Sequence, residues 1–193
     1  MILAAGRSSR MGLRNKLLEP IGGEPMVRRV AAIALGSGAE PIVVVTGHEA
    51  ASVGAALQGL GVTLILNPDY ADGLSTSLRA GLSALPSGID GALILLGDMP
   101  EVEASVLSAL ISSFTGMSAI CVPVRDGLRG NPVLWGSRYF PEMMELTGDF
   151  GAKPLMARHE AQLIEVEVTT DSILHDIDAP EDLARLKQPG ETS

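Results

Sequence analysis

Three short, continuously apolar runs alternate with helix-like segments, and this alternation constrains the fold of the 193-residue chain most strongly. The runs are PIVVVT (41–46), VTLIL (62–66) and ALILL (92–96). Runs of this length and character predict strands that are covered on both faces. The Ala- and Leu-rich segments between them predict helices over residues 26–35, 50–57 and 75–85. Because a repeated strand–helix order produces right-handed crossovers, we predict an α/β fold with a three-layer, doubly wound, mainly parallel sheet.

The second half of the chain continues this order and then departs from it. A helix over 102–114 and a strand over 119–124 come first. After Gly127 the pattern predicts strands over 132–135 and 163–168, with short helices over 138–146 and 152–159 between them. The segment Asp178-Ala179-Pro180-Glu181-Asp182 is typical of a helix start. We see no linker, so we expect one domain over residues 1–193.

The first sixteen residues form a second informative feature. A short apolar run ends in Leu3-Ala4-Ala5-Gly6, and Arg10 and Lys16 follow. Ala5 and Gly6 allow a ligand close to the backbone, whose successive N–H groups can form an anion-binding concavity. The two cations add fixed positive charge, so the segment is suited to a triphosphate. Its spacing differs from that of a P-loop and from the GxGxxG dinucleotide fingerprint.

Polar residues follow several of the predicted strands. Ligands of an open parallel sheet bind beyond the carboxyl ends of its strands. That edge would carry the first loop, Thr46, Asn67 and the Gly97-Asp98 pair. Asp98 is the best candidate metal ligand, because an acid at the end of a buried run needs a compensating charge. Mg²⁺ takes few carboxylates and completes its shell with water and phosphate oxygens.

Composition excludes several classes of function. With 14 Lys and Arg against 23 Asp and Glu the net charge is −9, so we expect no nucleic-acid partner. Basic residues crowd into the first thirty positions, where Arg28 and Arg29 can also be a solvated face. The single Cys121 excludes an internal disulfide and is predicted to be a buried strand residue. Without a bilayer-length apolar stretch or a signal peptide, we expect no membrane partner and a cytoplasmic location.

These motifs together resemble those of the MobA-like nucleoside-triphosphate transferases, and within them most closely the molybdenum cofactor cytidylyltransferases. The LAAGxSxRMG loop with Lys16 carries the resemblance first. Further matching segments follow in family order at residues 67–68, 73–78, 97–100, 129–133, 148–153 and 176–183. Family members have a longer strand before the loop, so we expect this sequence to begin within its first strand.

The resemblance implies a Mg²⁺-dependent nucleotidyl transfer on a Rossmann-like nucleotidyltransferase fold. A phosphate oxygen of the acceptor attacks the α-phosphorus and pyrophosphate leaves, and an ionised nucleophile needs no general base. Asp98 would bind Mg²⁺ while Arg10 and Lys16 hold the phosphates, so these three are the predicted catalytic residues. A late aspartate would be the second metal ligand. Asp178 matches its place better than Asp176, and Asp178 fits a helix cap equally well.

We predict that the nucleotide is bound by residues of the first loop and of the strand ends. They are Leu3, Ala4, Ala5, Gly6, Arg10, Lys16, Thr46, Asn67, Ser75, Ser77 and Gly97. Ser75 can also cap the helix that follows. Family members that use GTP tend to carry LAGG, whereas the cytidylyl group carries LAAG as here. The Ala5 methyl narrows the base pocket, which favours cytosine.

The resemblance assigns acceptor binding to residues 127–180, at Asn131, Asp149 and Lys153. Many cytidylyl relatives have His in place of Asn131 and Arg in place of Lys153, and lysine does not reproduce a bidentate arginine–phosphate contact. The predicted reaction is CMP transfer from CTP to a molybdopterin-type molybdenum cofactor, with a molybdoenzyme as a candidate client. The alternatives are guanylyl transfer to the same cofactor, cytidylyl transfer to a sugar or polyol phosphate, and a non-catalytic cofactor-escort protein.

Overall fold

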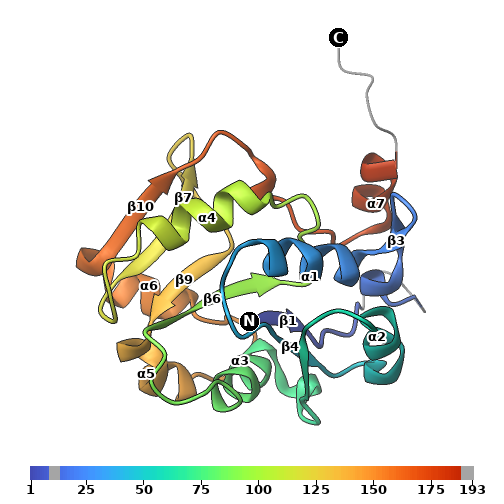
Figure 1. Ribbon diagram of the computed structural model, residues 1–193, viewed down its shortest axis with the longest axis horizontal. Coiled ribbons are helices and arrows are strands. Elements are labelled where there is room, and N and C mark those ends of the chain that lie inside the picture. The colour runs from blue at the N-terminus through green and yellow to red at the C-terminus, as the bar shows by residue number, and fades with distance from the viewer. Residues whose placement is uncertain (9–13, 188–193) are drawn as a thin grey trace.

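The computed structural model describes residues 1–8 and 14–187 and has the three-layer α/β architecture that the sequence predicts (Figure 1). The main-sheet strands are β1 (Ile2–Ala4), β4 (Val43–Thr46), β5 (Thr63–Leu66), β6 (Gly91–Leu96), β7 (Ile120–Arg125), β8 (Leu128–Arg129), β9 (Val133–Gly136) and β10 (Leu163–Glu167). The helices are α1 (Met26–Gly36), α2 (Ala50–Ala56), α3 (Leu74–Ser83), α4 (Ala104–Ser112), α5 (Phe140–Met144), α6 (Lys153–Arg158) and α7 (Pro180–Lys187). A small hairpin consists of β2 (Pro20–Ile21) and β3 (Glu24–Pro25).

The order of the strands creates a ligand-binding crevice. In the described part of the chain, eight strands form one sheet in the order β10-β7-β9-β6-β1-β4-β5, with β8 paired to β7. β1 is parallel to β4 on one side and to β6 on the other. The direction in which strands are added therefore reverses at β1. Crevices open at such a point, beyond the carboxyl ends of the strands, so the loops after β1 and β6 flank this one.

Strand β9 runs against its two neighbours and brings a distant segment to the same edge. β9 is antiparallel to both β6 and β7, and its first residue, Val133, pairs with Ile94 near the end of β6. Asn131 precedes β9 by two residues and so reaches the edge that carries Asp98. The sequence predicted this strand but did not reveal its direction.

Alternation along the strands supplies two apolar layers. Ile2 and Ala4 face a core that includes side chains of α1, α2, α4 and α7. Met1, Leu3 and Ala5 face the opposite core, which includes side chains of α3, α5 and α6. Figure 1 shows α1 and α4 on one side of the strands and α3 and α5 on the other. Cys121 of β7 is fully buried, as its sequence context predicted.

The expectation that every apolar run is covered on both faces is wrong for residues 63–66. Among the described strands, β5 pairs with β4 alone and forms one edge of the sheet. Leu64 and Leu66 of this strand are exposed. An apolar run of strand length does not distinguish a central strand from an edge strand, because both are rich in the same residues.

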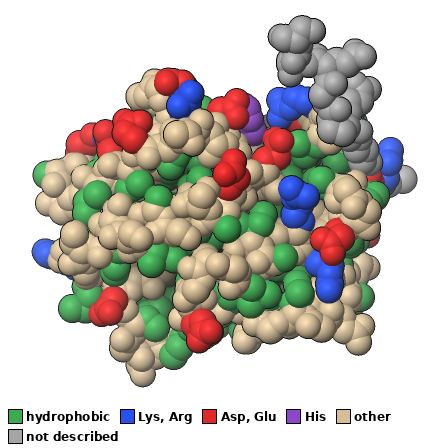
Figure 2. All heavy atoms as spheres, turned by 45° about the horizontal axis from the view of Figure 1, so that its top comes forward, with side chains coloured by type: hydrophobic (Ala, Val, Ile, Leu, Met, Phe, Trp, Pro, Cys, Tyr) green, Lys and Arg blue, Asp and Glu red, His purple; other side chains and the backbone are tan. Residues whose placement is uncertain are grey.

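The molecular surface over α1 and α4 carries scattered acidic side chains and single hydrophobic ones (Figure 2). Such scattered apolar residues are normal on a protein surface. Within the described ranges, no helix combines the length and the apolar character that spanning a bilayer requires.

Candidate active site

The loop after β1 forms one wall of a cavity of about 440 Å³, which we call the loop cavity. Six of the predicted nucleotide-binding residues line it, namely Leu3, Ala4, Ala5 and Gly6 of this loop together with Lys16 and Ser77. The Ala5 carbonyl accepts a hydrogen bond from the His48 N–H at 3.1 Å, which fixes the loop to the segment after β4. The side chain of Ala5 is buried while Gly6 is exposed, so the backbone at Gly6 is open to a ligand.

A short, capped turn positions Lys16 in this cavity. Asn15 accepts a hydrogen bond from the Leu17 N–H at 3.1 Å and caps the 3-10 helix Lys16–Leu18. The Lys16 N–H donates to the hydroxyl of Ser8 at 3.1 Å. These contacts direct Lys16 into the loop cavity, where its side chain is largely buried. The other predicted phosphate ligand, Arg10, lies outside the described residues.

Lys16 joins two aspartates that are 80 residues apart in sequence. Its Nζ lies 2.7 Å from Asp98 Oδ2 and 2.7 Å from Asp178 Oδ1. Asp176 completes a cluster in which one carboxylate oxygen of each aspartate lies within 4.8 Å of the others. A backbone hydrogen bond joins the two segments that carry the cluster: the N–H of the buried Ile177 donates to the Asp98 carbonyl at 2.9 Å.

Burial and charge act against each other in this cluster. Burial raises the pKa of the Asp98 carboxyl above its usual value, while the adjacent Lys16 ammonium lowers it. Burial alone would lower the pKa of Lys16, but the charges and hydrogen bonds of Asp98 and Asp178 outweigh it and raise that pKa. The lysine therefore stays protonated and compensates carboxylates that would otherwise be costly to bury.

The cluster fits a hard divalent cation. Asp98 Oδ1 is buried and has no hydrogen-bond partner among the described residues, so one carboxylate oxygen is left to be satisfied by something else. The available donors are all carboxylate oxygens, which are the ligands that Mg²⁺ prefers. Asp178 lies against the same lysine as Asp98, whereas Asp176 is exposed and lines the cavities on either side.

Other predicted nucleotide-binding residues lie at different depths. Ser77 lines the loop cavity. Asn67 is 2% exposed, and its amide donates to the hydroxyls of Thr76 and Ser77 at 2.8 and 3.0 Å, which fixes the start of α3. Buried Thr46 donates to the Ile65 carbonyl at 3.2 Å. The nucleotide-binding roles of Thr46 and Asn67 stay predictions.

Two further residues of that set lie at the ends of α3 and β6. The Ser75 hydroxyl is buried without a partner in the described part of the chain, so it makes no capping bond at the start of α3. The Gly97 N–H donates to the Leu3 carbonyl at 2.9 Å. A Cβ at Gly97 would lie 3.1 Å from that carbonyl oxygen, so glycine allows β1 and the end of β6 to approach closely.

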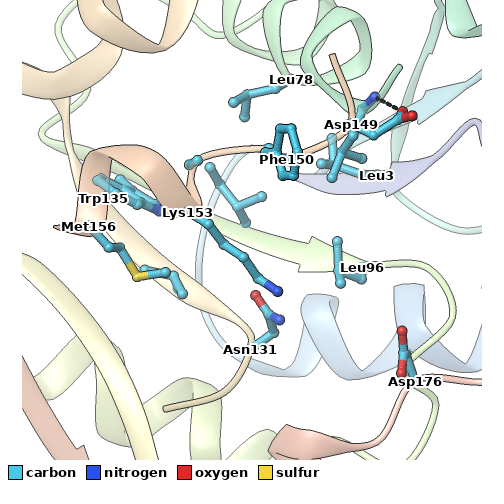
Figure 3. Close-up of a pocket in the computed structure, with 15 residues that line it drawn as sticks. Leu3, Leu78, Leu96, Asn131, Trp135, Asp149, Phe150, Lys153, Met156 and Asp176 are labelled. Atoms are coloured by element: carbon cyan, nitrogen blue, oxygen red, sulfur yellow. Dashed lines mark hydrogen bonds between the residues drawn. The ribbon is translucent and has the colours of Figure 1, made fainter. Parts of the chain in front are cut away.

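The three predicted acceptor-binding residues line a second cavity, of about 260 Å³, which we call the apolar cavity. Asn131 and Lys153 point toward one another across it (Figure 3). Asp149 accepts a hydrogen bond from the Leu74 N–H at 3.2 Å, which ties its loop to the start of α3. Asp149 and Asp176 line both cavities, which therefore adjoin one another.

Sequence reasoning missed several lining residues. Tyr70 contributes to the loop cavity, and Arg7 stacks over its ring at 5.8 Å. Trp135, Phe150 and Met156 line the apolar cavity. Trp135 is the single tryptophan of the chain, and Phe150 is an aromatic residue between two polar, glycine-containing turns, so both carried a weak signal.

The small-residue loop after β1 and an acidic cluster meet at the switch point of a doubly wound sheet, as expected for a nucleotidyltransferase-type site. The model of the MobA-like NTP transferase domain matches residues 1–163. The chain belongs to this family of nucleotidyltransferases.

Individual relatives agree with this assignment. The purine catabolism protein PucB of Bacillus subtilis is 32% identical over 195 residues, which cover 94% of this chain and 92% of PucB. The bifunctional protein GlmU of Clavibacter sepedonicus is 36% identical over 116 residues, and the match covers 58% of this chain but only 24% of GlmU. The matched part of this chain therefore corresponds to about a quarter of that relative.

Solved structures show the same fold over nearly the whole chain. The nucleotidyl transferase Mth528 from Methanothermobacter has a TM-score of 0.84 at 29% identity, covering 96% of this chain and 94% of its own. Rv0371c from Mycobacterium tuberculosis has a TM-score of 0.86 at 27% identity, covering 96% and 95%. A structure of Rv0371c in complex with manganese has a TM-score of 0.81 at 26% identity, covering 98% and 97%.

Proposed function

We propose that this nucleotidyltransferase moves CMP from CTP to a molybdopterin-type molybdenum cofactor and releases pyrophosphate. The observation that carries the proposal is that two unlike cavities adjoin one another beside the acidic cluster. One contains the LAAG loop and Lys16, and the other has predominantly apolar walls with a single Lys153 ammonium. A triphosphate and a heterocyclic acceptor phosphate would meet between them, at Asp98 and Asp176.

In the reaction, a phosphate oxygen of the acceptor attacks the α-phosphorus of CTP. A new P–O bond forms, the bond to the β-phosphate breaks, and pyrophosphate carries away the electron pair. Lys16 would neutralise charge that grows on the leaving phosphates. Mg²⁺ bound by Asp98 and Asp178 would supply further neutralisation and hold the α-phosphate in place. An ionised phosphate nucleophile requires no general base, so positioning provides most of the catalysis.

The choice of cytosine rests on Ala5. Its methyl lies in the wall of the loop cavity, and an added Cβ on Gly47 would come within 2.9 Å of it, so the wall behind Ala5 is closely packed. Because close packing prevents this wall from moving back to admit a larger base, it favours cytosine over the larger guanine.

The test is pyrophosphate release by the purified protein with each of the four NTPs, in the presence and absence of molybdenum cofactor. We expect release with CTP that depends on the cofactor. Release that is equally fast with GTP contradicts the cytidylyl assignment, and no release with any NTP contradicts transfer to this acceptor. A molybdoenzyme would be the natural recipient of the product, as its client.

A further inference from the structure

The apolar cavity, rather than the loop that contains the phosphate-binding residues, defines the chemical class of the acceptor. We propose that the acceptor inserts a flat heterocyclic ring into this cavity, and that Phe150, Trp135 and Met156 select such rings over polyhydroxylated sugars. The inference rests on the proposed function and adds to it the residues that determine acceptor specificity.

The walls of the cavity come from both the sheet and the helices that cover it. Ile94, Val133 and Trp135 contribute from β6 and β9, Leu78 from α3 and Met156 from α6. Figure 3 shows Leu78 across the cavity from Trp135 and Met156, with Leu96 at the end nearer Asp176. Trp135 is 1% exposed, so its indole forms part of the interior and is not a surface residue.

Phe150 stands at the rim of the cavity. Phe150 is 74% exposed, although phenylalanine is among the residue types that are most often buried. The loop that carries it is anchored on one side, because the Gly148 carbonyl accepts from the Ser75 N–H at 3.1 Å and Asp149 accepts from the Leu74 N–H. Gly148 and Gly151, on either side of Phe150, have positive φ of 77° and 53°. Glycine adopts this conformation without steric strain, and the conformation places the Phe150 ring at the cavity mouth. A ring entering the cavity would stack against Phe150 and bury it.

The polar side chains that line the cavity are few. Asn131, Lys153 and Asp176 supply them, together with Asp149 on the side shared with the loop cavity. A sugar or polyol would bury several hydroxyl groups against aliphatic and aromatic walls, and each unpaired hydroxyl is costly to bury. At about 260 Å³ the cavity lies just below the lower end of the range of about 300–1,000 Å³ that small-molecule pockets span, so it suits one ring system. An anionic tail on that ring would extend past Lys153 toward the acidic cluster.

The chain contains its own reporter for this inference, since Trp135 is its single tryptophan and lines the cavity. The experiment titrates the protein, without nucleotide, with pterin-6-carboxylate and in parallel with ribitol 5-phosphate. Binding is followed by quenching of tryptophan fluorescence and checked by calorimetry. We expect the pterin to quench Trp135 and to bind at least about tenfold more tightly than the polyol phosphate, from the cost of unpaired hydroxyls.

Variants at the rim provide the sharper result. Phe150→Ala should weaken pterin binding about three- to tenfold, on the scale of one lost aromatic stack, and Phe150→Tyr should restore it. Leu66→Ala is the matched control, because Leu66 is an exposed apolar residue at the far edge strand. Equal affinity for both probes, or an affinity for the pterin that is unchanged in Phe150→Ala, overturns the inference.

Because binding is measured without CTP, the two proposals fail separately. Normal pterin binding with no transfer to molybdenum cofactor would refute the proposed reaction while supporting the ring site. Transfer to the cofactor that proceeds unchanged in Phe150→Ala would refute the ring site and leave the reaction in place.

Discussion

The Nζ atom of Lys16 lies 2.7 Å from Asp98 Oδ2, although the family resemblance assigns the lysine to phosphate and the aspartate to metal. The same ammonium contacts Asp178 at 2.7 Å and so stands between the two carboxylates proposed as metal ligands. In this position the single positive charge of Lys16 neutralises part of the carboxylate charge. A divalent cation would neutralise that charge when it is bound. On the proposed assignment, we expect metal and lysine to compete for the same carboxylates until the phosphates of a nucleotide draw the lysine away.

The first prediction follows from this competition. Lys16→Met should raise the affinity for Mn²⁺ without nucleotide by about tenfold or more, because it removes a positive charge within a few ångströms of the ion. The same variant should slow turnover with CTP more than it weakens CTP binding, and so should Arg10→Ala. Free Mn²⁺ is measured by electron paramagnetic resonance. Arg125→Met is the control variant, because it removes a cation that pairs with the exposed Asp126. An unchanged Mn²⁺ affinity in Lys16→Met would show that the ammonium does not occupy the metal site.

The second prediction concerns Asp98. Asp98→Asn should cut transfer by at least roughly a hundredfold, the scale of losing a principal electrostatic stabiliser. Folding should be retained, because the contact with Ile177 uses the backbone carbonyl of Asp98 rather than its side chain. Circular dichroism checks the fold and a steady-state assay checks the rate. Full activity in saturating Mg²⁺ would remove Asp98 from the site.

The third prediction distinguishes the two late aspartates. Asp178→Asn should weaken Mn²⁺ binding in the presence of CTP more than Asp176→Asn does, since Asp178 shares the Lys16 ammonium with Asp98. Asp176 is exposed, and its removal leaves that pair of carboxylates in place. Calorimetric titration of both variants gives the comparison. The reverse order of losses would assign the second ligand to Asp176.

The strand–helix alternation was sufficient to predict the sheet, its layers and the edge at which the site lies. The direction of β9 was not predictable, because Val133-Leu134-Trp135 is apolar in either orientation. The pairing of Lys16 with Asp98 could not be predicted from the sequence either, because contacts between residues far apart in the chain depend on tertiary packing. The acceptor residues Asn131, Asp149 and Lys153 were grouped by resemblance, whereas their aromatic and apolar neighbours could be identified only from the cavity itself.

The fourth prediction concerns the choice of base. Ala5→Gly removes one methyl from the wall of the loop cavity, a change worth about 1–3 kcal/mol at most. The preference for CTP over GTP should therefore fall by about tenfold or more without being inverted. Ratios of kcat/KM for the two nucleotides measure it. A ratio that does not change would place the base away from Ala5.

The fifth prediction concerns the segment that supports the acidic cluster. At Gly130 an added Cβ would overlap the Ile173 carbonyl, and the next residue, Asn131, donates its N–H to that carbonyl at 2.9 Å. Gly130→Ala should lower the free energy of unfolding by about 1–3 kcal/mol, as overpacking does. Gly36→Ala is the control, because a Cβ there meets open space at the end of α1. Thermal unfolding compares them, and equal melting temperatures would contradict the steric argument.

The backbone hydrogen bond from Ile177 to Asp98 also bears on how the enzyme is made. It joins residues 79 positions apart, and contacts of such high sequence separation are slow to form because a long loop must close first. A nascent chain that extends just past Asp98 already carries the loop after β1 and all of β6, but neither Asp176 nor Asp178 has yet been synthesised. On the proposed assignment, the metal site would be completed only after the sheet is assembled, and we expect a C-terminally clipped chain that lacks Asp176 and Asp178 to bind nucleotide without transferring it.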